Sequence, residues 1–174
     1  MTMEWIYARN DGRRVAFPST AVEIIEKFRQ AHDEACEAGG MLLGRIIAET
    51  GDVVVDELTQ PTPDDSRTRF TFVRGKAFAQ DLVNRAWSYS SGTRIYLGEW
   101  HSHPESRPTP SPQDVGNWRA VVQGAKYEQN ELLFVIVGLD EVGVWELRRR
   151  QRLPVRLKEI KQAQMPNSGG GRRH

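Results

Sequence analysis

The sequence EWHSHP occupies residues 99–104, and SPQD follows at residues 111–114. Side chains alternate between the two faces of a β-strand, so on a strand His101 and His103 point to the same side. Asp114 lies 11 positions after His103 and can complete a set of two imidazoles and one carboxylate. Such a set, with a fourth position open for water, is typical of a hydrolytic zinc centre. The stretch therefore predicts a strand, a helix start and a metal site together.

Around this stretch, the sequence predicts strands interspersed with three helices. Thr20 and Glu23 form a capping-box pattern near the start of the first helix. Ser111 has N-cap chemistry, and Pro112 suits the first position of the last helix. The predicted helices are 19–35, 74–87 and 111–123, and the predicted strands are 41–47, 53–58, 70–73, 94–101, 132–137 and 142–147. We expect an α/β or α+β sandwich whose sheet is covered by helices.

The composition is that of one globular domain. With 174 residues and 39% hydrophobic residues, the chain is long enough to bury a core. A net charge of +1 gives no general attraction to nucleic acid or anionic lipid, and no apolar run approaches the length that spans a bilayer. There is a single cysteine, Cys36, and the N-terminus lacks the pattern of a secretory signal, so we expect a cytoplasmic protein.

The C-terminal part of the chain is basic from Arg148 onward. Seven basic residues occur between positions 148 and 161, which predicts a solvated helix face or tail, with a docking patch for an acidic partner as the alternative. The composition of residues 167–171 is typical of a flexible linker. We expect one domain over residues 1–160 and a flexible tail over residues 161–174.

The histidine motif resembles the signature of the JAMM (also JAB or MPN-plus) metalloprotease family. Upstream, EAGGMLLG at residues 37–44 is similar to the family's second element, a glutamate that leads into a strand rich in glycine and leucine. The resemblance covers about residues 20–147 and looks closest to the small bacterial branch of the family. It implies a mixed, curved sheet flanked by helices, the cytidine-deaminase-like architecture of that family.

The resemblance also assigns roles to five residues. His101, His103 and Asp114 would hold one Zn²⁺, which lowers the pKa of a bound water molecule. Glu37 would take the proton of that water and pass it to the departing amine. Ser111 would donate a hydrogen bond to the oxyanion of the tetrahedral intermediate. Cys36 has no role in this scheme.

Each of these residues also has an ordinary structural explanation. A His-x-His pair occurs on strand surfaces and in cores, Ser111 and Asp114 suit a capping box, and Glu37 alone is an unremarkable surface glutamate. Two further carboxylates are rivals of Glu37 for the proton transfer. Glu99 shares the strand face of the histidines, and Glu34 lies one helical turn before Glu37 if the first helix extends that far. Trp100 points away from the histidines and is expected in the core.

By resemblance, the expected function is that of a zinc-dependent isopeptidase or peptidase. It would cut after the C-terminal tail of a ubiquitin-like modifier or of a similar conjugated protein, to remove the modifier or to trim its precursor. The bacterial branch is associated with antiphage (CBASS-type) and mobile-element operons, so the expected partners include activating and conjugating enzymes. A peptidase for a sulfur-carrier protein and a non-catalytic scaffold of the same fold remain as alternatives.

The loop over residues 105–110 follows the histidines directly and is stiffened by prolines. It is either a simple connection or a backbone edge to which an extended substrate tail adds as a strand. Residues 59–69 are a candidate for the opposite wall of such a cleft.

Overall fold

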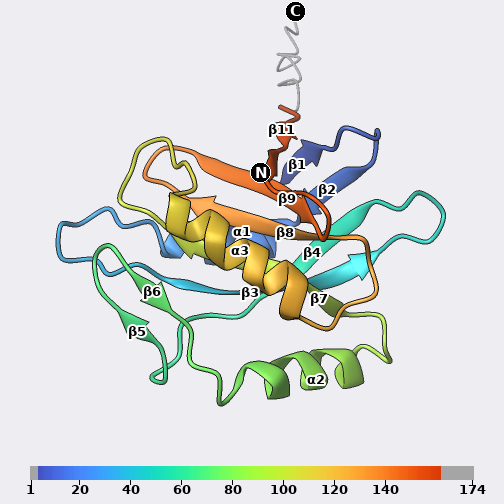
Figure 1. Cartoon of the computed structure of the whole chain (residues 1–174), viewed down its shortest axis with the longest axis horizontal. Helices are drawn as coiled ribbons and strands as arrows, with labels where there is room; N and C mark the ends of the chain where they lie inside the picture. Colours follow the sequence, from blue (N-terminus) through green and yellow to red (C-terminus); the bar gives the residue numbers. More distant parts are fainter. Residues whose placement is uncertain (1–3, 162–174) are drawn as a thin grey trace, which may run out of the picture.

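The computed structural model describes residues 4–161, which contain three helices, a nine-stranded sheet and a two-stranded sheet (Figure 1). The helices are α1 (Ser19–Lys27), α2 (Ala79–Tyr89) and α3 (Pro112–Gly124); the strands are β1 (Trp5–Ala8), β2 (Arg14–Phe17), β3 (Gly39–Ile46), β4 (Val53–Leu58), β5 (Ser66–Arg67), β6 (Phe72–Val73), β7 (Ile95–Ser102), β8 (Glu131–Val137), β9 (Val142–Arg148), β10 (Val155–Arg156) and β11 (Lys158–Glu159). None of the three helices is long and apolar enough to cross a membrane.

The large sheet is mixed, as expected, and β7 lies next to its central strand, β3. The strand order is β10-β9-β8-β7-β3-β4-β2-β1-β11. Strand β7 runs antiparallel to β3 and parallel to β8, and the β2–β4 pair is also parallel. The predicted strands over residues 41–47 and 53–58 are confirmed as the hairpin β3–β4, those over 132–137 and 142–147 as the hairpin β8–β9, and the helix that begins after Ser111 is confirmed as well. The histidine strand is therefore supported on both sides by long neighbouring strands.

One C-terminal segment joins the two ends of this sheet. Strand β10 pairs with β9, whereas β11, after a single intervening residue, pairs with β1. That residue, Leu157, is buried and donates its backbone N–H to the carbonyl of Val144 at 2.8 Å. Nearby, the buried guanidinium of Arg9 binds the carboxylates of Glu146, at 2.8 Å, and Glu131, which lie on β9 and β8. The curved sheet is therefore nearly closed.

This closure corrects the prediction for the basic C-terminal run. Residues 155–159 form edge pairs with two strands and are not a solvated helix face or a tail. Sequence periodicity missed them because each pairing covers only two residues, too few to produce an alternating pattern. Except for Lys161, the tail predicted for residues 161–174 lies outside the described residues, and so do residues 167–171.

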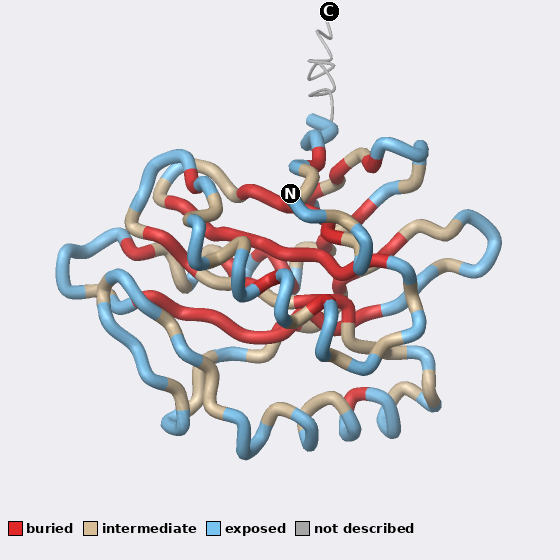
Figure 2. Tube along the Cα trace, in the orientation of Figure 1, coloured by how far each residue is buried: buried red, intermediate tan, exposed pale blue. Residues whose placement is uncertain are grey.

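The core lies on both faces of the sheet, and β8 shows this most clearly. Every residue of β8 is buried: Leu133, Val135 and Val137 belong to the cluster on the α1 side, whereas Leu132 and Phe134 belong to the cluster under α3. A strand covered on both faces has a continuous apolar sequence instead of an alternating one. Figure 2 shows the buried trace along the central strands, while α2 at the lower edge is mostly exposed. Helix α3 therefore shields the face on which the predicted ligands lie.

The first helix ends earlier than the sequence predicts. Helix α1 stops at Lys27, and residues 29–38 form an irregular segment that leads into β3. The predicted capping box of Thr20 and Glu23 is also wrong, because the helix begins at Ser19 with Pro18 as its N-cap, so Thr20 already lies inside the first turn. The predicted extension of this helix to residue 35 is therefore wrong.

Three smaller differences concern other elements. The hairpin of β1 and β2 was not predicted, although Asp11-Gly12 between two apolar runs is a hairpin signal and Gly12 has a positive φ of 86°. Helix α2 begins at Ala79 instead of residue 74. The strand predicted over residues 70–73 is only the two-residue β6, which pairs with β5 in the small sheet.

Candidate metal centre

Strand β7 and its extension place the two histidines on one side of the sheet. His101 is paired with Gly39 of β3 and with Ile136 of β8, and His103 continues the strand by donating its N–H to the Val137 carbonyl at 2.9 Å. The Nε2 atoms of the two imidazole rings lie 2.9 Å apart. The prediction that a strand directs both rings to a common point is confirmed.

The start of α3 supplies the third predicted ligand. Ser111 is the N-cap residue, and Asp114 is the third residue of the helix. The Asp114 N–H donates to Ser111 Oγ at 3.1 Å, while Asp114 Oδ2 accepts from the Ser111 N–H at 2.7 Å and from its hydroxyl at 2.8 Å. This is a complete capping box, so the structural explanation for the Ser-x-x-Asp pattern is correct. The same box also fixes the carboxylate in front of the two histidines.

The donor groups of the three residues lie close enough together to share one ion. Nε2 of His101 lies 3.2 Å from Asp114 Oδ1, and Nε2 of His103 lies 3.3 Å from Asp114 Oδ2. Two ligand atoms bound at the usual Zn–N and Zn–O lengths lie about 3.3 Å apart in a tetrahedral site. Both imidazole nitrogens face each other and the carboxylate, an arrangement that suits a shared cation. One ligand atom from each residue lies within 4.8 Å of the others.

The two imidazole rings are also held by contacts with residues other than Asp114. The His101 ring meets Trp118 of α3 edge-on at 6.3 Å between centroids, and Trp118 stacks on Phe134 at 4.6 Å. Nδ1 of His103 is buried and lies 3.8 Å from the carboxylate of Glu105. A carboxylate facing the second nitrogen of a metal-binding histidine is a common orienting device.

The electrostatics favour a negatively charged Asp114. Burial acts to raise the pKa of its carboxyl, but the contacts with His101 and His103 outweigh burial and hold this pKa well below its usual range. Burial acts to lower the pKa of His103, but the bond to Asp114 and the neighbouring acidic groups outweigh it and raise this pKa. The cluster thus already attracts positive charge in the absence of an ion.

Glu37 lies beside this cluster, in the segment before β3. It is two residues before Gly39, the partner of His101 in the sheet, and is 6% exposed. Its pKa is raised to about 7, chiefly by burial and further by the charges of Asp114 and Glu105, against the opposing effect of His103. A carboxyl group with this pKa can exchange a proton near neutral pH.

The two rival carboxylates have other surroundings. Glu99 forms an ion pair with Arg74 at 2.6 Å and accepts a hydrogen bond from the Tyr96 hydroxyl at 3.3 Å, so its carboxylate already has two partners. Glu34 is exposed on the irregular segment, and the helix that would have placed it one turn before Glu37 does not extend that far. Cys36 is exposed.

Two other predictions concern neighbours of the histidines. Trp100 is 1% exposed and donates its indole N–H to the Thr59 carbonyl, which confirms it as a core residue. In the loop over residues 105–110, the carbonyls of Glu105 and Ser106 accept N–H groups of the β8–β9 turn, so this part of the loop edge is already paired.

Sequence reasoning missed two buried polar residues beside the site, Gln30 and Ser102. Ser102 is the middle residue of the His-Ser-His motif, and it points to the opposite face of the strand, into the core. A small polar residue at a core-facing strand position is a signal that a hydrogen-bond partner is present, but the sequence does not identify that partner.

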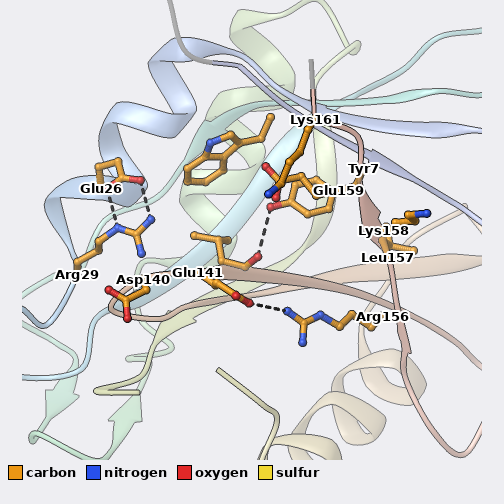
Figure 3. Close-up of a pocket in the computed structure, with 12 residues that line it drawn as sticks. Tyr7, Glu26, Arg29, Asp140, Glu141, Arg156, Leu157, Lys158, Glu159 and Lys161 are labelled. Atoms are coloured by element: carbon orange, nitrogen blue, oxygen red, sulfur yellow. Dashed lines mark hydrogen bonds and ion pairs between the residues drawn. The ribbon is translucent and has the colours of Figure 1, made fainter. Parts of the chain in front are cut away.

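A cavity of about 760 Å³ lies elsewhere, where the C-terminal segment of β10 and β11 meets β1, α1 and the β8–β9 turn (Figure 3). Its lining mixes acidic and basic side chains, such as the paired Glu26 and Arg29. None of the five predicted site residues lines it. The candidate metal centre is therefore distinct from this cavity.

Comparisons with known proteins agree with this geometry. The family of prokaryotic homologs of the JAB domain matches residues 20–153, a range that contains all five predicted site residues. A protein of Pseudomonas aeruginosa named CD-NTase/cGAS isopeptidase is 35% identical over 133 residues, which cover 76% of this chain and 82% of that protein. Proteins of the same name are 34% identical in Vibrio cholerae (76% of this chain, 80% of that protein) and 30% identical in Escherichia coli (81% and 86%). The chain therefore belongs to the family of prokaryotic homologs of the JAB domain.

Proposed function

We propose that this chain is a zinc-dependent isopeptidase. It hydrolyses the amide bond that follows the C-terminal tail of a ubiquitin-like modifier, or of a protein such as a CD-NTase that is conjugated in the same way. The observation that carries the proposal is the convergence of His101, His103 and Asp114: the two Nε2 atoms lie 2.9 Å apart, and they lie 3.2 and 3.3 Å from Oδ1 and Oδ2 of Asp114, respectively. The names of the three relatives supply the substrate class.

In this proposal, His101, His103 and Asp114 hold the ion, and the first two do so as neutral imidazoles. Zn²⁺ bound there would act as a Lewis acid toward the scissile carbonyl and would acidify a water molecule. Glu37 accepts the proton of the attacking water and returns it to the departing amine, a task that suits a pKa near neutrality. No covalent intermediate with the protein is required.

Ser111 has two tasks in the proposed reaction. Its Oγ accepts the Asp114 N–H, which holds the helix cap, and its hydroxyl proton is directed at Asp114 Oδ2. Rotation about the C–O bond turns this proton toward the developing oxyanion while Oγ keeps its place in the cap. The residue therefore supports the ligand before substrate binds and the oxyanion during the reaction.

The proposed biological setting is the bacterial cytoplasm, with the activating and conjugating enzymes of the same pathway as partners. The enzyme would reverse conjugation there, or prepare a precursor for it. The complete set of donor residues favours this activity over a non-catalytic scaffold, and the relatives' names favour it over sulfur-carrier processing.

The direct test uses a CD-NTase encoded by a neighbouring gene, fused through its C-terminal tail to a reporter protein. We expect the purified enzyme to cut once, immediately after the tail, and mass spectrometry of both products will locate the cut. Chelation should abolish cleavage and added Zn²⁺ should restore it. Cleavage that persists after complete removal of metal would contradict the proposed chemistry, and cleavage elsewhere would contradict the proposed substrate.

A further inference from the structure

Glu37 lies at the end of a segment that regular secondary structure does not hold. Residues 29–38 connect α1 to β3 without a helix or strand, and residues 31–34 are all exposed. A group that transfers protons must be held within a fraction of an ångström of its working position. The placement of Glu37 therefore needs an anchor elsewhere.

Gln30 is one such anchor, since its amide connects three separate segments. The side chain is 2% exposed, and its Nε2 donates to the carbonyls of Ala35, at 3.1 Å, and Arg69, at 2.8 Å. Its Oε1 accepts the hydroxyl of Ser102 at 3.0 Å. Both amide N–H groups and the oxygen are thus used in the protein interior, where a lost partner is costly.

Ser102 carries this connection to the residue next to Glu37. Its Oγ accepts the N–H of Ala38 at 2.9 Å, and its own N–H donates to the Ala38 carbonyl at 2.8 Å. Ser102 is fully buried and is flanked in the sequence by the two histidines. Both polar backbone groups of Ala38 are therefore fixed to the strand that carries the proposed ligands.

The small sheet holds Glu37 from the other side. The Glu37 N–H donates to the Thr68 carbonyl at 2.7 Å, and Arg67 Nε donates to the Glu37 carbonyl at 2.7 Å. Because Gln30 also binds Arg69, it links this β5–β6 hairpin to the histidine strand. The backbone of Glu37 lies between two supports that Gln30 ties together.

We infer that Gln30 and Ser102 are positioning residues, which fix Glu37 against the strand of His101 and His103. The inference rests on the proposed function, in which Glu37 transfers the proton. Ser102 points away from the histidines, so it acts through Ala38 and does not contact substrate. Loss of either side chain should slow the chemical step and leave binding of the ion and the substrate intact.

The variants Gln30→Met and Ser102→Ala test this, with Gln129→Met as the matched control. Gln129 also donates its Nε2 to a backbone carbonyl, that of Tyr96 at 2.7 Å, toward the opposite end of β7. We expect kcat to fall about tenfold to a hundredfold in the first two variants, with KM and zinc content unchanged, and to stay near wild type in the control. Ser102→Thr, which keeps the hydroxyl, should retain more activity than Ser102→Ala.

The double variant and hydrogen exchange separate positioning from general stability. Because the two side chains act through one chain of bonds, Gln30→Met with Ser102→Ala should lose no more activity than the worse single variant. Amide exchange at residues 37 and 38 should quicken in both variants but not in Gln129→Met, with or without Zn²⁺. Equal losses of kcat in all three variants, or unchanged exchange at these amides, would overturn the inference.

A failure of the proposed function would look different. If the wild-type protein cleaved no conjugate, the proposed activity would be refuted, whereas the exchange data would still decide whether Gln30 and Ser102 anchor residues 37 and 38. Unchanged exchange would overturn the anchoring even in an active enzyme.

Discussion

At the scale of single residues, the behaviour of Glu37 depends on where its carboxyl group is buried. Burial raises its pKa to about 7, and the acidic neighbours Asp114 and Glu105 add to this effect. A bound cation acts in the opposite direction, as His103 already does, because positive charge favours the carboxylate. Without an ion, the Glu37 carboxyl is therefore only partly ionised near neutral pH, whereas a bound cation would favour the carboxylate that accepts a proton.

Replacing Glu37 by glutamine should remove proton transfer without removing the ion. We expect Glu37→Gln to lower kcat about a thousandfold with zinc content unchanged, since general acid–base catalysis contributes about 10²–10⁴-fold. Wild-type kcat/KM should rise with pH through a limb at or below pH 7, because the base must be deprotonated. Glu99→Gln is the control and should stay active; the reverse result would place the base at Glu99.

The raised pKa of Glu37 also predicts how the metal-free protein responds to pH. As pH rises from about 4.5 to about 7, the unfolded chain releases a proton that the folded protein retains, so this group lowers the free energy of unfolding over that window. A glutamine stays neutral. Metal-free Glu37→Gln should therefore melt higher than wild type at about pH 8 and equally at about pH 4, in thermal unfolding with chelator. A wild type that melts higher at the alkaline pH would contradict the burial argument.

Ser111 combines a cap with a proposed donor, and two substitutions separate these tasks. Ser111→Ala should cost about 1 kcal/mol of stability through the lost cap and lower kcat about 10²–10³-fold through the lost donor. Ser111→Thr keeps the hydroxyl and should retain most of both. Steady-state kinetics, zinc analysis and thermal unfolding measure the three effects. A loss of bound zinc that accounts for the whole loss of turnover would show that Ser111 serves only to hold Asp114.

At the scale of elements, the sequence predicted those whose pattern is local and long. Strand β8 and helix α3 were correctly placed, the first by an unbroken apolar run and the second by Ser111 and Pro112 at its start. The end of α1 was wrong because tertiary bonds of Gln30 hold the following segment in an irregular path. Strands β10 and β11 were missed because each is only two residues long, and the partner of β11 is also distant in the sequence.

The candidate site shows the same difference between features with a local sequence pattern and features that depend on long-range contacts. The residues themselves were predicted by spacing and family resemblance, and the structure brings His101, His103 and Asp114 together. The support of Glu37 by Gln30 and Ser102 was not predicted, since hydrogen bonds between positions 72 residues apart leave no periodic trace. Long-range polar contacts are what the pattern of a single sequence lacks.

Helix α3 packs through Trp118 on the face of the sheet that carries His101, and this contact can be tested against an exposed tryptophan. Trp118 packs on Phe134, Trp145 and the His101 ring, and Trp118→Ala should cost about 3–5 kcal/mol and lower the melting temperature by roughly 10 °C. Trp87 on α2 is 55% exposed, so Trp87→Ala should change stability far less. Thermal unfolding of both variants measures the difference. Similar losses would mean that α3 is not held by this contact.

At the scale of the whole molecule, the fold depends on how the ends of the sheet meet. Strand β7 lies near the centre of the sheet and carries the candidate site, whereas β9 and β1 are near the two ends and are joined by residues 155–160. The buried contacts of Arg9 with Glu131 and Glu146 cross the same gap. Removing one partner of such a buried pair leaves an uncompensated charge, so this link is sensitive to substitution but adds little net stability when intact. We therefore expect the C-terminal segment, residues 155–160, to contribute most of the stability that holds the two ends of the sheet together.

Two truncated chains test this contribution of the C-terminal segment. A chain that ends after Pro154 loses β10, the buried side chain of Leu157 and β11, and it exposes the apolar surface of Trp5 and Tyr7 that this segment covers. We expect a loss of about 3 kcal/mol, seen as a melting temperature lower by roughly 6–12 °C. A chain that ends after Lys161 keeps every closing contact made by residues 4–161, and we expect it to melt like the full chain. Equal melting of the two truncated proteins would show instead that the Arg9 pairs alone hold the ends of the sheet together.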